Sequence, residues 1–315
     1  MKLVPPVPAP GSLPRPQVVE RLAGPEAPIS LISAPAGWGK TSLLAEWIGA
    51  EEGRGPVAFL RLEEGDDSGP VFWTYAVAAL RRACPELAAG AEDALRSPDV
   101  DPMRDVVPSL LNELTEVDEP LLLVLDDYHV ISREDIHRSV GYLIDHLPPG
   151  VQLAIATRAD PRLPLGRLRA SGNLLELRAH DLAFSVTETA ELLRRRFAVD
   201  LDDGSVELLR RRTEGWPAAV HLAGLSLQGA YDPSGFVVRF AGDDRNVADY
   251  LMGEALGRVS EADREFLLRT AVLDQMTGLL CEEVAGVTDG AATLDRLERS
   301  GLFLNPLDNT RSWYR

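Results

Sequence analysis

Short and almost wholly apolar runs alternate with helical periodicity through the first half of the chain. Such runs occupy residues 29–33, 57–62, 120–131, 151–158 and 174–178. Helical spacing of apolar residues follows the first run and recurs at 70–84 and 104–117. Strands that are apolar on both faces and alternate with helices form parallel sheets with both faces covered. The pattern therefore predicts a doubly wound α/β domain over residues 28–184.

The pattern becomes helical throughout after residue 185. Helices are expected at 187–197, 204–213, 217–229 and 247–257. The last block contains three short helical stretches and ends in "GLFLNPLDNTRSWYR", which is typical of a hairpin with its turn at "LDNT". We therefore expect a helical domain at 185–258 and an incomplete winged-helix domain at 259–315. Residues 1–27 are rich in proline and are expected to be extended.

Charge and composition narrow the possible partners. The net charge of −17 disfavours direct binding of this segment to duplex DNA or to an anionic membrane. Cys84 and Cys281 have no partner at metal-ligand spacing, so they are expected to be reduced thiols in a cytoplasmic protein. The proline-rich N-terminus does not resemble a signal peptide, and no apolar run is long enough to span a membrane.

One lysine stands in a glycine-rich segment of a chain that otherwise uses arginine. Among the 32 basic residues only Lys2 and Lys40 are lysines. The segment "APAGWGKT" matches the phosphate-loop pattern G-x-x-x-x-G-K-[ST], with Ala34 in place of the first glycine. It follows a predicted strand and opens a predicted helix, as the pattern requires. The alternative is a glycine-rich turn that binds nothing.

Each residue type in this segment has a physical role in holding a nucleotide with Mg²⁺. Gly37 and Gly39 let backbone N–H groups wrap the phosphates, and the start of the helix favours their negative charge. Lys40 offers a compact ammonium to the β- and γ-oxygens, a role for which a planar guanidinium is too wide. The Thr41 hydroxyl is a ligand for Mg²⁺. The predicted nucleotide-binding residues of this loop are Ala36, Gly37, Trp38, Gly39, Lys40, Thr41 and Ser42.

Two further strand ends carry candidate catalytic side chains. The strand "LLLVLDD" ends in Asp126, predicted to hold Mg²⁺, and in Asp127, predicted to orient or deprotonate the attacking water. The strand "LAIATR" ends in Arg158, a candidate sensor of the γ-phosphate. The alternatives without a functional role are an ordinary polar strand end for the aspartates and a solvated side chain for the arginine. Nearby arginines could take the same role, and they are Arg162, Arg167 and Arg169.

The segment "TEGWPAAVHLAGLSL" begins a helix at Pro217, which suits the first turn of a helix. Trp216 and Pro217 are predicted to contact the base or ribose of the nucleotide. The alternative is a simple helix cap with a core tryptophan.

These segments, in this order, resemble the ATPase core of the large ATP-binding regulators of the LuxR type, the family of the maltose-regulon activator. That family belongs to the signal-transduction ATPases with numerous domains (STAND). Segments that carry the resemblance also include "LEEGDD", "VFWTYAVAAL", "ATRADPRLPLGRLRASGNLLELRAHDLAFSVTET" and the N-terminal "KLVPPVPAPGSLPRPQVVERL". The resemblance implies that the strand at 151–157 inserts between the phosphate-loop strand and the Asp126 strand.

The resemblance also implies a function. It implies an ADP-bound resting state and a state with ATP and an inducer that self-associates and activates transcription, reset by slow hydrolysis. Inducer and DNA would bind through C-terminal sensor and helix-turn-helix domains that lie outside this sequence. The chain is thus expected to be an N-terminal fragment of a longer regulator or the product of a truncated gene.

Other functions remain open at this point. The same ATPase module could serve another regulatory output, such as a kinase-linked regulator. A small-molecule phosphotransferase would need its own acid–base residues, and the five histidines form no obvious cluster. A scaffold that no longer binds nucleotide is disfavoured by the intact Lys40, Thr41 and Asp126.

Overall fold

The computed structural model divides the chain into two compact units. The first comprises Met1–Ser33 and Gly39–Asp181, and the second comprises Ala34–Trp38 and Leu182–Arg315. The residues that the structure describes are 2–24, 27–51, 55–240, 245–254, 260–299, 304, 307–308 and 310–314.

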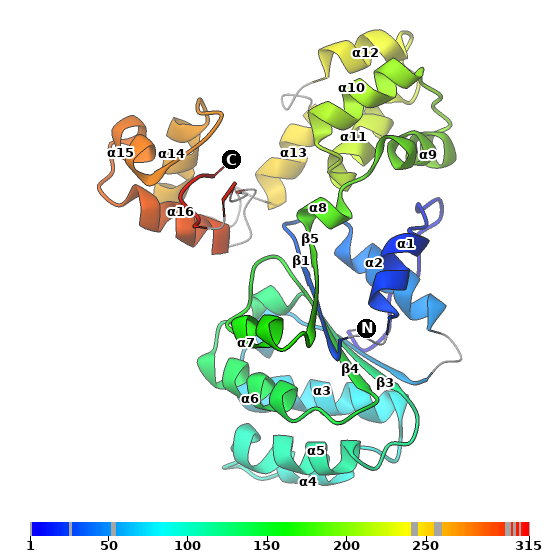
Figure 1. The fold of residues 1–315 in the computed structure, drawn as a ribbon, viewed down its shortest axis with the longest axis vertical. Helices are drawn as coiled ribbons and strands as arrows, with labels where there is room; N and C mark the ends of the chain where they lie inside the picture. Colours follow the sequence, from blue (N-terminus) through cyan, green and yellow to red (C-terminus); the bar gives the residue numbers. More distant parts are fainter. Residues whose placement is uncertain are drawn as a thin grey trace. The chain divides into compact units, whose positions relative to one another are not determined.

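Five parallel strands form the sheet of the first unit, in the order β2-β3-β4-β1-β5 (Figure 1). The strands are β1 (Ile29–Ser33), β2 (Val57–Arg61), β3 (Leu121–Asp126), β4 (Val151–Thr157) and β5 (Leu174–Arg178). All five lie within the apolar runs of the sequence, although the run at 120–131 also includes the helical turn Tyr128–Val130 after β3. Strand β4 lies between β1 and β3, which is the insertion that the family resemblance implied.

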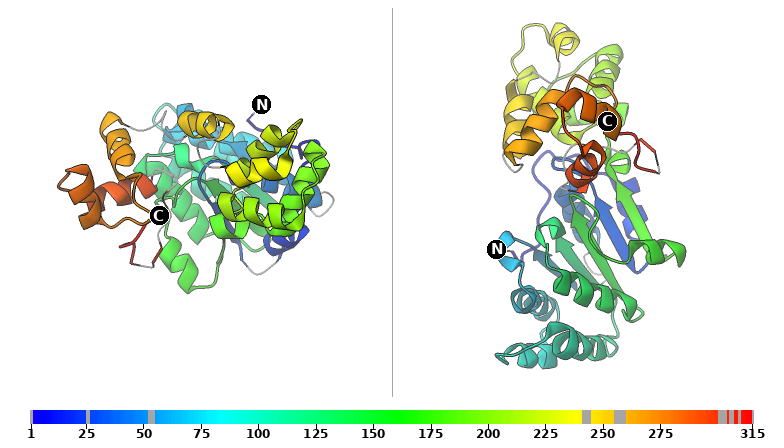
Figure 2. Two further views of the ribbon diagram at one scale, coloured as in Figure 1. Left: turned by 90° about the horizontal axis from the view of Figure 1, so that it is seen from above. Right: turned by 90° about the vertical axis from the view of Figure 1, so that its left-hand side faces the viewer.

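Both faces of this sheet are covered by helices, because its strands are apolar on both sides. Leu31, Leu123 and Ile155 face one core, which they share with side chains of α3 and α6. The alternate residues Ile32 and Val124 are equally buried on the opposite face, where α2 lies (Figures 1 and 2). The carboxyl ends of the strands meet at one edge of the sheet, where the candidate site residues stand.

The helices of the first unit are α1 (Pro16–Leu22), α2 (Lys40–Ala50), α3 (Gly69–Ala83), α4 (Ala89–Leu95), α5 (Val107–Leu114), α6 (Glu134–Asp145) and α7 (Leu165–Ala170), with short helical turns η1 (Glu64–Asp66), η2 (Pro102–Val106) and η3 (Tyr128–Val130). The sequence pattern predicted α2, α3 and α5 but not α1, α4, α6 and α7. The predicted helix at 104–117 is divided into η2 and α5. The prediction of an extended N-terminus is wrong for Pro16–Leu22, since Pro16 starts a helix that buries Val18, Val19 and Leu22.

The second unit begins with a bundle of helices that follows the turn α8 (Ala179–Leu182). Its helices are α9 (Val186–Phe197), α10 (Asp203–Thr213), α11 (Pro217–Leu227), α12 (Pro233–Arg239) and α13 (Arg245–Glu254). Ser185 caps α9 and pairs with Glu188 in a capping box. Helix α11 contacts both α9 and α13, so it is central to the bundle.

Three further helices close the second unit, and they are α14 (Glu261–Thr270), α15 (Gly278–Ala285) and α16 (Gly290–Arg299). Their shared core contains Phe266, Cys281, Leu294 and Tyr314. Tyr314 also forms an antiparallel bridge with Met276. The predicted hairpin lies partly outside the described residues; within them, the Leu307 N–H donates to the Trp313 carbonyl at 2.8 Å.

Candidate nucleotide-binding site

A strand, a loop and a helix form the candidate phosphate loop. Strand β1 ends at Ser33, residues 34–39 turn, and α2 begins at Lys40. Gly37 and Gly39 both have left-handed backbones, with φ of 75° and 78°. Residues other than glycine rarely adopt this conformation. The loop therefore has the backbone geometry for which its two glycines were singled out.

The surroundings of the two glycines differ. A Cβ on Gly39 would meet no atom within 4 Å, whereas a Cβ on Gly37 would lie 2.6 Å from Ala218 Cβ and 2.9 Å from both Trp216 Nε1 and Tyr250 Oη. Gly37 is thus required by close packing as well as by its φ. Gly39 leaves open space beside the start of α2.

Lys40 is buried at the start of α2 and is only 8% exposed. Burial lowers the pKa of its ammonium to about 8, and the Arg158 guanidinium contributes in the same direction. The carboxylates of Asp127 and Asp126 oppose this shift only in part. A buried cation in this position is suited to an anionic ligand, whose negative charge would restore the ammonium form.

Thr41 and Asp126 meet at the carboxyl edge of the sheet. The Thr41 hydroxyl donates to Asp126 Oδ2 at 3.0 Å, although the two residues are 85 positions apart. Asp126 is fully buried, and burial together with the Asp127 carboxylate raises the pKa of its carboxyl group. A hydroxyl and a buried carboxylate so close together fit a Mg²⁺ ion that is completed by phosphate and water oxygens. Within the described residues no three histidine, cysteine or acidic side chains gather into a metal site of their own.

Asp127 has a strained backbone and an unexpected partner. Its φ is 58°, in the left-handed region. Arg61 Nε, at the end of β2, donates to Asp127 Oδ2 at 3.0 Å. The sequence analysis missed Arg61, although a signal was available, because Arg61 ends the strand that pairs with β3 and lies opposite Asp126 in the register.

Arg158 follows β4 directly, and its charge acts on Lys40. The three alternative arginines are drawn to carboxylates elsewhere: Arg162 to Glu134, Arg167 to Asp145, and Arg169 to Glu176 and Asp160. Among the four, Arg158 is the one whose charge acts on Lys40. Its role at the γ-phosphate stays a prediction.

Arg178 also lies at this edge of the sheet and was not singled out from the sequence. It ends β5 opposite Ser33 and forms ion pairs with Asp160 and Glu176. The Ser33 hydroxyl donates to Asp160 Oδ1 at 3.0 Å. This network connects the end of β1 to the end of its neighbour β5.

Trp216 contacts the phosphate loop itself. Its indole N–H donates to the Ala36 carbonyl at 3.2 Å, and the Ala218 N–H donates to the Gly37 carbonyl at 3.1 Å. The Tyr250 ring lies edge-on to Trp216, with centroids 5.6 Å apart. The start of α11 thus holds two carbonyls of the loop. Contact of Trp216 and Pro217 with a base stays a prediction, as does a role for Trp38 and for Ser42, which is exposed.

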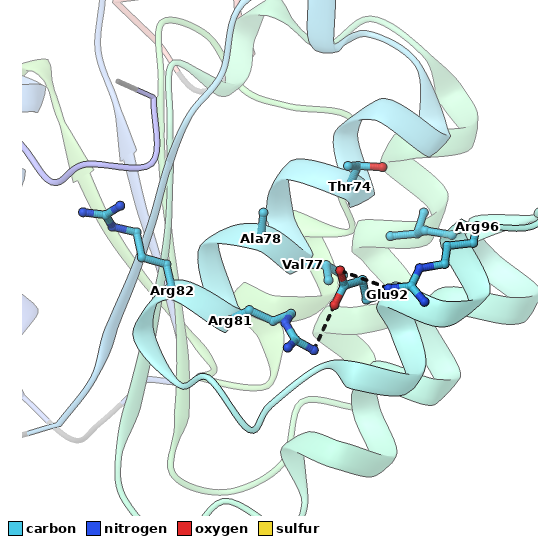
Figure 3. Close-up of a pocket in the computed structure, with 8 residues that line it drawn as sticks. Thr74, Val77, Ala78, Arg81, Arg82, Glu92 and Arg96 are labelled. Carbon is cyan, nitrogen blue, oxygen red and sulfur yellow. Dashed lines mark ion pairs between the residues drawn. The ribbon is translucent and has the colours of Figure 1, made fainter.

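A pocket of about 480 Å³ lies elsewhere, beside α3 and α4 (Figure 3). Arg81 and Arg96 both form ion pairs with Glu92 in it, at 2.9 and 3.7 Å. Arg82 points away from that carboxylate (Figure 3). None of the lining residues was predicted to bind nucleotide.

In the part of the chain that the structure describes, every helix is too short or too polar to cross a bilayer.

Comparisons with known proteins agree with this architecture. Residues 252–315 match the family model of the MalT winged helix domain. A Walker-type ATPase of Pyrococcus abyssi is similar in structure, with a TM-score of 0.62 at 17% identity over 99% of this chain and 95% of that one. A STAND protein with a tetratricopeptide repeat sensor from Pyrococcus horikoshii matches with a TM-score of 0.48 at 13% identity, over 98% of this chain and 41% of that one.

Proposed function

We propose that this chain is the ATP/ADP-binding switch module of a transcription regulator of the LuxR type. It combines a phosphate-loop ATPase fold with a helical region and a region that matches the MalT winged helix domain. In this proposal the ATP-bound protein self-associates in response to an inducer, and slow hydrolysis returns it to the ADP-bound state. The MalT-type domain supports a regulatory output rather than metabolic turnover.

The observation that carries the proposal is the Thr41–Asp126 pair at 3.0 Å beside the buried Lys40. Lys40 would bind the β- and γ-phosphate oxygens, and Thr41 and Asp126 would hold Mg²⁺. The metal would neutralise phosphate charge when bound. Asp127 would orient or deprotonate the attacking water, and Arg158 would contact the γ-phosphate.

Residues 34–38 would link the state of the bound nucleotide to the position of helix α11. Their N–H groups would face the phosphates, while the carbonyls of Ala36 and Gly37 accept hydrogen bonds from Trp216 and Ala218. A ligand that arranges the loop differently in the diphosphate and triphosphate states would therefore act on the start of α11. Such a ligand can shift a conformational equilibrium only by its difference in affinity for the two forms.

Nucleotide binding is tested with the purified chain. Nucleotide released on denaturation is identified, and ADP and a non-hydrolysable ATP analogue are then titrated with Mg²⁺. We expect a Kd in the micromolar range or tighter, which corresponds to about −8 kcal/mol. Lys40→Ala should weaken binding at least about a hundredfold, because it removes a buried cation from the phosphates.

Arg82→Ala is the matched control, since Arg82 is an exposed basic residue outside the candidate site. It should leave the Kd unchanged. Absence of binding by the wild-type chain, or equal binding by Lys40→Ala, would overturn the proposal.

A further inference from the structure

Arg61 lies where it can control Asp127. It is the last residue of β2, which forms one edge of the sheet. Its Nε donates to Asp127 Oδ2 at 3.0 Å, across a separation of 66 positions. Strand β2 lies on one side of β3, whereas β4 and β1, with the phosphate loop, lie on the other. The ion pair therefore ties the Asp127 carboxylate to the edge strand of the sheet.

The backbone of Asp127 keeps its side chain in this arrangement. Its left-handed conformation is unusual for a residue with a side chain and must be held by its surroundings. The Asp127 N–H donates to Asp126 Oδ1 at 3.0 Å, and the Asp127 carbonyl accepts from the Val130 N–H at 3.2 Å. Asp127 Oδ1 lies 3.9 Å from His129 Nδ1. Both carboxylate oxygens thus face groups of the protein.

The N-terminus fixes the end of β2 that carries Arg61. The Arg61 N–H donates to the Lys2 carbonyl at 2.9 Å on the open edge of the sheet. The Lys2 ammonium reaches Asp66 Oδ1 at 2.7 Å and lies 3.7 Å from the centroid of the Tyr75 ring. Because Asp66 is only 1% exposed, this contact is a firm anchor. Arg61 is thereby held in register with Asp126 and close to Asp127.

We propose that Arg61 is a positioning residue that restrains Asp127 and keeps hydrolysis slow. This inference rests on the proposed ATPase function. In hydrolysis the water oxygen bonds to the γ-phosphorus, the bond to the bridging oxygen of ADP breaks, and Asp127 accepts the proton of the water. While Arg61 donates to Oδ2, that oxygen is engaged and Asp127 is restrained from approaching the water. Breaking the pair releases the side chain.

A purely structural role for the pair would have different consequences. The Arg61 side chain is 56% exposed, and ion pairs so exposed contribute little to folding. Removing the Arg61–Asp127 ion pair should therefore leave the protein folded. The effect should be confined to the mobility of residues 126–131 and to the rate of the chemical step.

The test compares wild type, Arg61→Ala, Arg61→Lys, Asp127→Asn and the double variant Arg61→Ala/Asp127→Asn. In nucleotide-free protein, Arg61→Ala should speed amide exchange of residues 126–131 roughly two- to fivefold, the range expected from an exposed ion pair. In single-turnover hydrolysis with saturating ATP and Mg²⁺, Arg61→Ala should be faster by a similar factor. Its Kd for ATP should not change.

Two comparisons test whether Asp127 is the residue that Arg61 restrains. The double variant should hydrolyse ATP at the rate of Asp127→Asn alone, and Arg61→Lys should restore much of the wild-type rate. An unchanged or slower Arg61→Ala, or a gain that persists without Asp127, overturns the inference. If wild type binds no nucleotide, the proposed function fails instead, and the exchange measurement still decides whether Arg61 restrains residues 126–131.

Discussion

Two buried ionisable residues define the candidate site at the level of single side chains. Lys40 and Asp126 both lie where the charged form is disfavoured, so the pKa of one is lowered and that of the other is raised. Proteins tolerate such groups where a ligand supplies the missing charge. A nucleotide would do so for Lys40, and Mg²⁺ would do so for Asp126.

The lowered pKa of Lys40 predicts a pH-dependent affinity for ADP. In the free protein Lys40 loses its proton near pH 8. Bound phosphates favour the ammonium form and raise this pKa, so binding above pH 8 takes up a proton. Affinity should be nearly constant from pH 6 to 7 and should fall by up to about tenfold per pH unit above 8.

Calorimetric titrations in buffers of different ionisation enthalpy would measure the proton uptake directly. Lys40→Met should bind weakly and without the uptake. An affinity of the wild type that stays constant to pH 9.5 would contradict the assignment of Lys40 to the phosphates.

Asp126→Asn should stabilise the protein when no nucleotide is bound. The raised pKa means that the buried carboxylate is destabilising at neutral pH and least so in acid. Removing the charge should increase the free energy of unfolding by about 0.5–2 kcal/mol at pH 7.5, as at other functional sites. The gain should shrink as the pH falls toward 4, where aspartate ordinarily takes up its proton.

Urea unfolding of both proteins at several pH values would measure this difference. The same substitution should abolish the increase in ATP affinity that Mg²⁺ provides. A destabilised Asp126→Asn, or one whose response to Mg²⁺ is intact, would contradict the predicted role.

At the level of elements, Ala36 and Gly37 of the phosphate loop pack against the start of α11. The loop places its two glycines in the same left-handed conformation, but only Gly37 is enclosed by side chains of α11 and α13. The two positions therefore separate the effect of backbone conformation from the effect of close packing.

Gly37→Ala should be much more damaging than Gly39→Ala. The strain of a left-handed alanine should destabilise each variant by about 1 kcal/mol. In Gly37→Ala the new methyl group also collides with Ala218, Trp216 and Tyr250, which should add about 1–3 kcal/mol. Thermal unfolding of both variants without nucleotide would measure the difference, and equal losses would show that the packing around Gly37 is looser than described.

At the level of the whole molecule, the proposed switch changes the protein from a population in the ADP-bound form to a population in the ATP-bound form. A complete change from one form to the other requires a difference in binding free energy of roughly 5 kcal/mol between them. The Trp216 and Ala218 hydrogen bonds to the loop are one place where such a difference could arise.

Self-association should therefore depend on the nucleotide. We expect light scattering after gel filtration to give one mass with ADP and a larger, concentration-dependent mass with an ATP analogue and Mg²⁺. Trp216→Phe keeps the aromatic ring but removes the indole N–H, so it should weaken the response while ADP still binds. The same mass with both nucleotides, in this chain and in any longer form of the protein supplied with its inducer, would refute the switch.

The sequence alone determined the strands, the phosphate loop and the order of the elements. These features are local, because an apolar run of five to seven residues or a glycine with φ near 75° depends chiefly on its neighbours in the chain. Asp126 could also be placed beside Thr41 in advance, since parallel strands bring their carboxyl ends to one edge. The N-terminal helix was missed because one starting proline was outweighed by a proline-rich surrounding.

The tertiary structure alone decided which distant residues meet. Arg61 reaches Asp127 only because β2 lies next to β3, and Trp216 reaches Ala36 across 180 positions because α11 begins against the loop. Lys2 likewise finds Asp66 through the path of the N-terminal segment along the sheet edge. Such contacts depend on how several elements pack together, and hydrophobic periodicity gives the buried face of each element but not the neighbour that will cover it.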